Sequence, residues 1–239
     1  MSVLLLQLTG PLQSWGEQSR FVQRQTNHFP TKSGILGLIA AAQGRRRTDL
    51  LEDLTQLRLG VRIDQPGRLI RDFHTALKPK KKTESFLSYR YYLGDAVFLA
   101  GVEGDHELLN GIAEAIRSPV FPLYLGRRSC PPSRPLIIED VNDMGLGEAL
   151  GHDWIASPWH QKKTRSERVT LEIFRDAQTA DEAGDQLRDV PISFSQEDRQ
   201  YGWRTVVRET VEVNNPSYVT HESSSNGTGD HDFMAAVGG

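Results

Sequence analysis

The sequence is poor in cysteine and has no long hydrophobic run. Cys130 is the single cysteine among 239 residues, so the chain can form neither an internal disulfide nor a cysteine-based zinc site. The longest apolar runs, residues 3–6 and 35–42, are far shorter than the roughly 20 residues that cross a bilayer. No charged segment precedes an apolar stretch at the start of the chain. We therefore expect a cytoplasmic protein without a membrane segment.

Sequence motifs for nucleotide hydrolysis, serine nucleophiles and dinucleotide binding are also missing. Histidines do lie near acidic residues, at 152–153, at 160 and at 230–232, but without the spacing of metal ligands. These absences predict a protein without a metal or a cofactor.

Charge is divided unevenly along the chain. The overall composition, 38% hydrophobic and 25% charged, is typical of a globular protein. Residues 1–134 contain 19 Lys and Arg against 12 Asp and Glu, whereas residues 135–239 contain 9 against 19. A basic first half suggests a polyanionic partner on one side of the molecule. Acidic loops and a tail that keep the protein soluble are the alternative explanation for the second half.

The order of the expected elements predicts an α+β fold with a ferredoxin-like (RRM-like) palm over residues 1–140. Residues 2–9, 59–64 and 95–102 have the character of strands. A helix is expected from about Thr31, a short one over 49–57, and an amphipathic one over 105–117 with Asp105 as its N-cap.

Two further regions are expected around this palm. Residues 67–92 predict an inserted β-hairpin, or thumb, with a basic tip that projects towards a partner. A strand is expected at 136–139, and strands at 167–175, 190–195 and 204–213 predict a small separate β-sheet in a C-terminal region, 141–213. Residues 214–239 are rich in Asn, Ser, Gly and Asp and predict a disordered tail.

The turn around Gly126 is the most informative local feature. Gly126 permits backbone conformations that other residues avoid, and Arg127 and Arg128 offer planar guanidinium groups that bind phosphate or stack on bases. Tyr124 and Ser129 flank them. The turn is a candidate phosphodiester site, and a solvated surface turn is the alternative.

Two other segments have candidate RNA contacts. Gln13 and Trp15 follow the first strand, where a base could stack on the indole, although Trp15 could equally be buried beneath the loop. Lys32 and Ser33 lie at the predicted helix start, where free N–H groups and the helix dipole favour an anion.

His28 lies near Arg20 and Arg24. A histidine beside lysines and tyrosines could cleave RNA by general acid–base chemistry without a metal. A binding or structural role is the more usual one for a histidine in a loop.

Taken together, these segments resemble the CasD-type subunit of the type I-E CRISPR Cascade complex, a member of the RAMP superfamily. The resemblance covers residues 1–213. It rests on three motifs in order, GPLQSWG at 10–16, FPTKSG at 29–34 and LGRRSCP at 125–131, with residues 72–75 and 88–96 between them.

The resemblance implies a non-catalytic subunit that caps the 5′ handle of the CRISPR RNA. It also implies a thumb that contacts the neighbouring backbone subunit, a contact with the large subunit, and a position near target DNA at the guide–target duplex. The expected RNA contacts are Gln13, Trp15, Arg20, Arg24, His28, Lys32, Ser33, Arg90, Tyr124, Gly126, Arg127, Arg128 and Ser129. The expected thumb contacts are Arg71, Lys78, Lys80, Lys81 and Lys82.

Two alternatives remain open at this point. In a related subtype the equivalent subunit cuts repeat RNA with tyrosine, lysine and histidine, and His28, Tyr89 and the lysines at 78–82 leave this possible. A protein scaffold without RNA contact would leave the paired arginines and the lysine cluster without a purpose.

Overall fold

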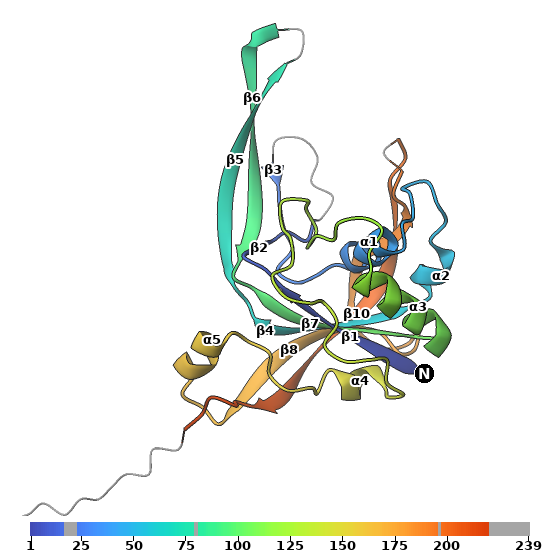
Figure 1. Cartoon of the computed structure of the whole chain (residues 1–239), viewed down its shortest axis with the longest axis vertical. Helices are drawn as coiled ribbons and strands as arrows, with labels where there is room; N and C mark the ends of the chain where they lie inside the picture. Colours follow the sequence, from blue (N-terminus) through green and yellow to red (C-terminus); the bar gives the residue numbers. More distant parts are fainter. Residues whose placement is uncertain (17–22, 79–80, 196, 220–239) are drawn as a thin grey trace, which may run out of the picture.

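The computed structural model describes residues 1–16, 23–78, 81–195 and 197–219 (Figure 1). The elements are β1 (Ser2–Thr9), β2 (Leu12–Gln13), β3 (Gln23–Arg24), α1 (Lys32–Ala42), α2 (Glu52–Thr55), β4 (Arg58–Gln65), β5 (Arg68–Lys78), β6 (Lys81–Gly94), β7 (Val97–Gly104), α3 (His106–Arg117), α4 (Leu146–Ala149), α5 (Pro158–Lys163), β8 (Arg168–Asp176), β9 (Asp185–Ser193) and β10 (Gln200–Asn214). Within the described ranges, no helix has both the length and the apolar character needed to cross a membrane.

An antiparallel six-stranded sheet with the order β1-β7-β4-β8-β10-β9 forms the centre of the molecule. Strand β1 shows why both faces of the sheet are buried. Leu4, Leu6 and Leu8 pack into the core beneath α1 and α3, whereas Val3 and Leu5 pack on the opposite face with residues of α4. In Figure 1 the two longer helices and α4 lie on opposite sides of the sheet. Because successive side chains of a strand point to opposite faces, β1 contributes to a separate hydrophobic core on each side of the sheet.

The two longer helices begin where their capping residues predict. Thr31 caps α1 through a bond from Gly34 N to its side-chain oxygen, and Asp105 caps α3 by accepting from the N–H groups of Glu107 and Leu108. The predicted helices at these positions are confirmed. The helix predicted over residues 49–57 is shorter and consists of α2 alone.

The chain after α3 returns along the free edge of β1. The predicted strand at 136–139 forms only isolated bridges there, with Leu6 opposite Ile137 and Val3 opposite Asn142. The N–H of Gln7 donates to Leu136 O at 2.7 Å. Because this segment covers β1, the edge of the sheet is not left open.

The predicted hairpin is present as a long two-stranded ribbon made of β5 and β6. Its strands pair from Arg68 opposite Gly94 to Lys78 opposite Lys81. In Figure 1 the ribbon rises well away from the body of the molecule. Its base is joined to the body by β2 and β3, which pair with β6 in antiparallel and parallel orientation respectively.

The prediction of a small separate C-terminal sheet is wrong. Strand β8 pairs with β4 through Gly60 opposite Arg175, so β8, β10 and β9 continue the central sheet. The strands themselves were predictable from their alternating pattern. The partner of β8 was not, because local alternation shows which face of a strand is buried but not which edge it will pair with.

The predicted tail boundary at residue 214 also needs correction. Asn215 is buried, and its side-chain amide donates to the carbonyls of Gln161, Thr164 and Ser166. These bonds fix the residue that follows β10 to α5 and to the segment after it. Residues 220–239 lie outside the described ranges.

Candidate nucleic-acid interface

The loop with the paired arginines is a tight turn held against the segment after β1. Leu125 N donates to Cys130 O at 2.7 Å, and Cys130 N donates to Arg127 O at 2.9 Å. Ser14 N donates to Leu125 O at 3.1 Å. Gly126 has a φ of +84°, and a Cβ at this position would stand 1.8 Å from Ser14 O. The turn therefore requires glycine for both conformation and space.

Arg127 holds this region together through hydrogen bonds to backbone carbonyls. Its Nη2 donates to Arg24 O at 2.9 Å and its Nη1 to Tyr91 O at 3.2 Å. Its guanidinium also lies 4.8 Å from the centre of the Tyr92 ring. Arg127 thereby ties the loop to β3 and β6. The carbonyls leave its positive charge in place, so the expected contact of Arg127 with RNA stays a prediction.

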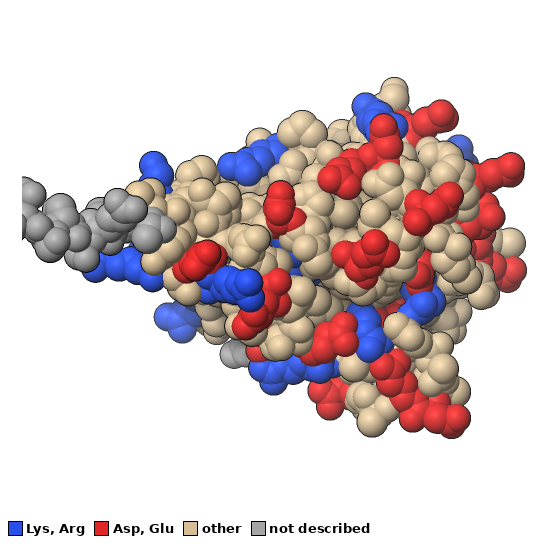
Figure 2. Space-filling view, turned by 90° about the horizontal axis from the view of Figure 1, so that it is seen from below, with Lys and Arg blue, Asp and Glu red and all other residues tan. Residues whose placement is uncertain are grey.

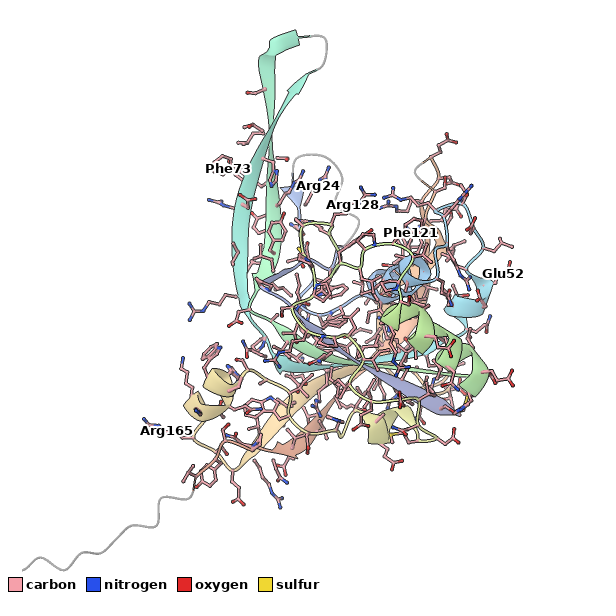
Figure 3. The ribbon with its side chains drawn as sticks, in the orientation of Figure 1. Arg24, Glu52, Phe73, Phe121, Arg128 and Arg165 are labelled. Carbon is pink, nitrogen blue, oxygen red and sulfur yellow. The ribbon has the colours of Figure 1, made fainter. Side chains whose placement is uncertain are left out.

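Three other arginines, which we call the ribbon-base arginines, remain available: Arg24, Arg90 and Arg128. Arg24 and Arg90 are directly paired in the parallel ladder between β3 and β6. Arg24 and Arg128 are exposed, and in Figure 3 they lie close together at the side from which the ribbon rises. None of these side chains has a carboxylate partner among the described residues. Three cations thus gather without internal neutralisation, an arrangement typical of a polyanion site.

Arg90 illustrates this lack of neutralisation. Its Nε atom is buried and has no hydrogen-bond partner within the described part of the chain. Asp72 lies opposite Arg90 on β5, but its carboxylate accepts from Phe73 N at 2.7 Å and pairs with His74 at 2.9 Å. A buried donor without an acceptor is costly, and no carboxylate of the described residues offsets that cost at Arg90.

Gln13 and Trp15 lie in the core and not on the surface. Trp15 is fully buried, and its Nε1 donates to Gln13 Oε1 at 3.1 Å. Gln13 in turn donates to Leu8 O at 2.9 Å and to Ala96 O at 2.8 Å. The base-stacking role expected of Trp15 is therefore wrong, and the alternative of a buried indole beneath the loop is right. Gln13 is likewise inaccessible to RNA.

The start of α1 does bind an anion, but the protein supplies it. Lys32 N donates to Asp189 Oδ2 at 2.7 Å, and Lys32 Nζ donates to Asp176 Oδ2 at 2.9 Å. Lys32 is only 6% exposed. The expected phosphate contact at Lys32 is thus contradicted, because Asp176 and Asp189 occupy the place of the phosphate. Ser33 is half-buried, and its Oγ lies 3.4 Å from Thr31 Oγ1.

Arg204 completes this buried ion-pair cluster by donating to both Asp176 and Asp189. Burial alone would raise the pKa of the Asp176 carboxyl, but the charges of Arg204 and Lys32 outweigh it and hold the pKa below its ordinary value. Sequence reasoning did not single out Asp176, Asp189 or Arg204. The acidic composition of the second half was the only sequence signal for the two aspartates. Their pairing with Arg204 and Lys32 could not be predicted, because it depends on how β8, β9 and β10 fold around α1.

His28 lies away from the ribbon. Its ring makes edge-to-face contacts with Phe29 at 4.8 Å and with Phe174 at 5.5 Å. It lines a pocket of about 350 Å³ together with Trp154 and His160. Tyr89, by contrast, lies on the ribbon with the Arg71 guanidinium 5.3 Å from its ring centre. Within the described ranges, no hydrogen bond or ring contact joins His28 and Tyr89.

The remaining predicted residues are placed as follows. Tyr124 is half-buried, and Ser129 is exposed beside Cys130. Arg20 and Lys80 lie outside the described residues, and of Lys78, Lys81 and Lys82 only the backbone at the ribbon tip is described. No three His, Cys, Asp or Glu side chains of the described residues are grouped closely enough to hold a metal ion.

One face of the ribbon is apolar and was not predicted. Leu69 and Phe73 are each 65% exposed, and Leu87 is also exposed. Leu69, Arg71 and Phe73 alternate along β5 and therefore share this face, with Tyr89 directly opposite Phe73. An exposed apolar and aromatic face of this kind is typical of a protein contact.

The comparisons with known proteins agree with this layout. The model of the family described as CRISPR-associated protein (Cas_Cas5) matches residues 3–207. The chain therefore belongs to this family of CRISPR-associated proteins. CRISPR system Cascade subunit CasD from Escherichia coli (strain K12) is 34% identical in an alignment of 157 positions, which covers 57% of this chain and 70% of that protein. The resemblance to the CasD type is confirmed.

Two solved structures are similar over most of their length. A chain of a CRISPR RNA-guided surveillance complex superposes with a TM-score of 0.75 at 30% identity, covering 91% of this chain and 93% of that one. A second structure, described as a Cas protein, gives a TM-score of 0.68 at 36% identity, covering 90% and 97%. The mixed α/β architecture with antiparallel sheets is thus shared with these proteins.

Proposed function

We propose that this chain is the non-catalytic subunit of a cytoplasmic Cascade surveillance complex that caps the 5′ handle of the CRISPR RNA. The ribbon-base arginines carry this proposal, because they place three cations beside the glycine turn without a carboxylate partner among the described residues. Family membership and the likeness to CasD and to a surveillance-complex chain support the assignment to such a complex. The handle phosphates would act as acceptors for Arg24, Arg90 and Arg128.

We interpret the body as the ferredoxin-like palm of the RAMP superfamily and the ribbon as its thumb. Strands β1, β7 and β4 are adjacent in that order, and residues 136–142 run along the other edge of β1. This is the strand arrangement of a ferredoxin-like sheet, with α1 and α3 as its two helices. The apolar face of the thumb would pack on the neighbouring backbone subunit, near the guide–target duplex of the DNA. The contact with the large subunit is also part of this proposal.

The absence of nuclease activity is part of the same proposal. General acid–base cleavage of RNA needs its acid and base within hydrogen-bond reach of one ribose. His28 contacts Phe174 of β8, whereas Tyr89 is packed under Arg71 on the ribbon. This separation favours RNA binding over the alternative of an endoribonuclease that processes the repeat.

The test is to replace Arg24 and Arg128 together with alanine and to measure binding of a labelled RNA that bears the repeat-derived handle. Loss of two phosphate contacts should weaken binding and lower the slope of log K against log salt by about 1.4, at roughly 0.7 per phosphate for a single strand. The matched control is the double replacement of Arg46 and Arg47, two exposed arginines after α1. It should leave the slope unchanged.

An unchanged slope in the folded Arg24/Arg128 variant would contradict handle binding at this site. The same incubations should leave repeat RNA intact, with and without divalent metal. Cleavage that disappears in His28→Ala or Tyr89→Phe would instead favour the endoribonuclease.

A further inference from the structure

The acidic half of the chain has a local group of cations at the end of α5 and directly after it. Four of its other arginines pair with carboxylates: Arg168 with Glu212, Arg175 with Glu182 and Glu209, Arg204 with two aspartates, and Arg208 with Glu172. Lys162, Lys163 and Arg165 are exposed, and none has a carboxylate partner among the residues that the structure describes. Figure 3 shows Arg165 pointing outward at the end of the molecule, and Figure 2 shows Lys and Arg gathered over that end.

An exposed indole lies on the same helix. Trp159 is 50% exposed and precedes Lys162 and Lys163 by three and four residues, so all three share one side of α5. We call Trp159, Lys162, Lys163 and Arg165 the α5 patch. Glu167 follows the patch closely in the chain and is exposed, whereas Glu212 of β10 pairs with Arg168 at 3.7 Å. The patch therefore keeps a net positive charge.

The indole is held in place by a series of aromatic contacts. The Trp159 ring meets the His160 ring edge-on at 5.4 Å, and His160 meets Trp154 in the same way at 5.7 Å. Trp154 is buried, and its Nε1 donates to Asp64 O at 2.9 Å. An aromatic ring that is ordered before binding loses little conformational entropy when a second ring stacks on it.

Helix α5 is fixed to the root of the ribbon. The N–H and hydroxyl of Ser157 donate to Gln65 Oε1 at 3.2 and 2.7 Å, and Gln65 Nε2 donates to Asp95 O at 2.6 Å. Gln65 ends β4 just before the ribbon, and Asp95 follows the ribbon directly. The α5 patch thus has a defined position beside the root, on elements different from those that carry the ribbon-base arginines.

We propose that the α5 patch binds single-stranded nucleic acid, with one base stacked on Trp159 and the backbone phosphates at Lys162, Lys163 and Arg165. A base stacked on an aromatic ring beside a track of cations is the usual chemistry of sequence-tolerant single-strand binding. RNA and DNA share this chemistry. The site does not depend on handle capping, because it uses none of the ribbon-base arginines.

Tryptophan fluorescence of the full-length chain tests the stacking directly. Trp15 and Trp154 are buried, which leaves Trp159 and Trp203 as the exposed indoles. Titration with oligouridylate and, separately, with oligodeoxythymidylate should quench the wild-type fluorescence. Trp159→Phe should abolish this quenching, whereas the control Trp203→Phe should retain it. Trp159→Ala should also weaken binding at least about 5-fold, the low end of what a stacked base contributes.

Charge replacements test the phosphate contacts. The double variant Lys162→Ala/Lys163→Ala should lower the salt slope by about 1.4, and the matched control Arg46→Ala/Arg47→Ala should not. Quenching by one oligonucleotide alone supports the site and identifies its strand as RNA or DNA. Quenching that survives in Trp159→Phe, or that disappears in Arg24→Ala/Arg128→Ala, would overturn the proposal, as would no quenching with either strand. Loss of quenching in Arg24→Ala/Arg128→Ala would refute the α5 site but would leave handle binding at the ribbon-base arginines intact. The two proposals can therefore fail separately.

Discussion

Positive charges are buried and paired at the start of α1, whereas they are exposed at the ribbon base. At α1, Lys32 and Arg204 are buried and neutralised by Asp176 and Asp189. At the ribbon base, Arg24 and Arg128 are exposed and have no carboxylate partner within the described ranges. Both regions offer the groups that bind phosphate, yet only one has them free.

This difference separates stability from binding. A buried ion-pair cluster contributes to stability only while every partner is present, because a single unpaired charge in the interior is expensive. Exposed cations contribute little to stability, and their net repulsion is relieved when a polyanion binds. The same residue type therefore holds the fold together in one region and remains available to a ligand in the other.

The largest effect is expected from Asp176→Ala. This change leaves Lys32 and Arg204 buried with fewer acceptors and removes the acceptor of Leu59 N. Breaking a buried pair in this way should lower the free energy of unfolding by about 3–5 kcal/mol. Urea unfolding followed by circular dichroism measures this, with Asp72→Ala on the exposed ribbon as the control. A loss below about 1 kcal/mol would mean that the cluster is not a stability element.

A smaller loss is expected from Gly126→Ala. The new Cβ would meet Ser14 O at 1.8 Å, and alanine disfavours a φ of +84°. Strain of this kind should cost about 1–3 kcal/mol and displace the loop that carries Arg128. Handle RNA binding should therefore fall together with stability. Gly147→Ala is the control, because a Cβ there meets nothing within 4 Å. Equal stability of the two variants would contradict the tight packing of the turn.

The buried ion-pair cluster should also make the stability of the protein depend on pH in the acid range. The folded-state pKa of Asp176 is lowered, so its contribution is present above the unfolded-state pKa of about 3.9 and is lost as pH falls through the folded-state value. The melting temperature of the wild type should therefore fall more steeply below about pH 4 than that of Asp176→Asn. Parallel curves for the two proteins would remove Asp176 from the acid-sensitive groups.

Local patterns predicted more of the fold than of the site. The caps at Thr31 and Asp105, the apolar faces of α1 and α3, and the alternating strands of the ribbon are set by neighbours within a few residues. The pairing of β8 with β4 is set by segments more than a hundred residues apart, and no local pattern contains it. The individual strands were therefore predicted, but their assembly into one six-stranded sheet was not.

The same limit explains the mixed result for the site. Arg127 and Arg128 are adjacent and chemically identical, but Arg127 faces the carbonyls of Arg24 and Tyr91 while Arg128 faces outward. Which of the two is free depends on where β3 and β6 lie. Trp15 was equally ambiguous, because an indole after a strand suits both a core and a binding surface, and only the packing of α1 over it decides.

The smallest effect on the binding of handle RNA is expected from Lys32→Met, which directly tests the contrast between the start of α1 and the ribbon base. Methionine retains the buried length of the side chain and removes the charge, while Asp176 keeps Arg204 and Leu59 N as donors. If the protein's own carboxylates occupy the anion site of α1, the affinity for handle RNA should change less than about twofold and the salt slope should stay the same. Arg128→Ala should lower that slope by about 0.7 with little change in unfolding free energy. Circular dichroism melts confirm that both variants are folded at the assay temperature. A slope lowered by the same amount in Lys32→Met would show that the helix start does bind phosphate, and the contrast between the two regions would then fail.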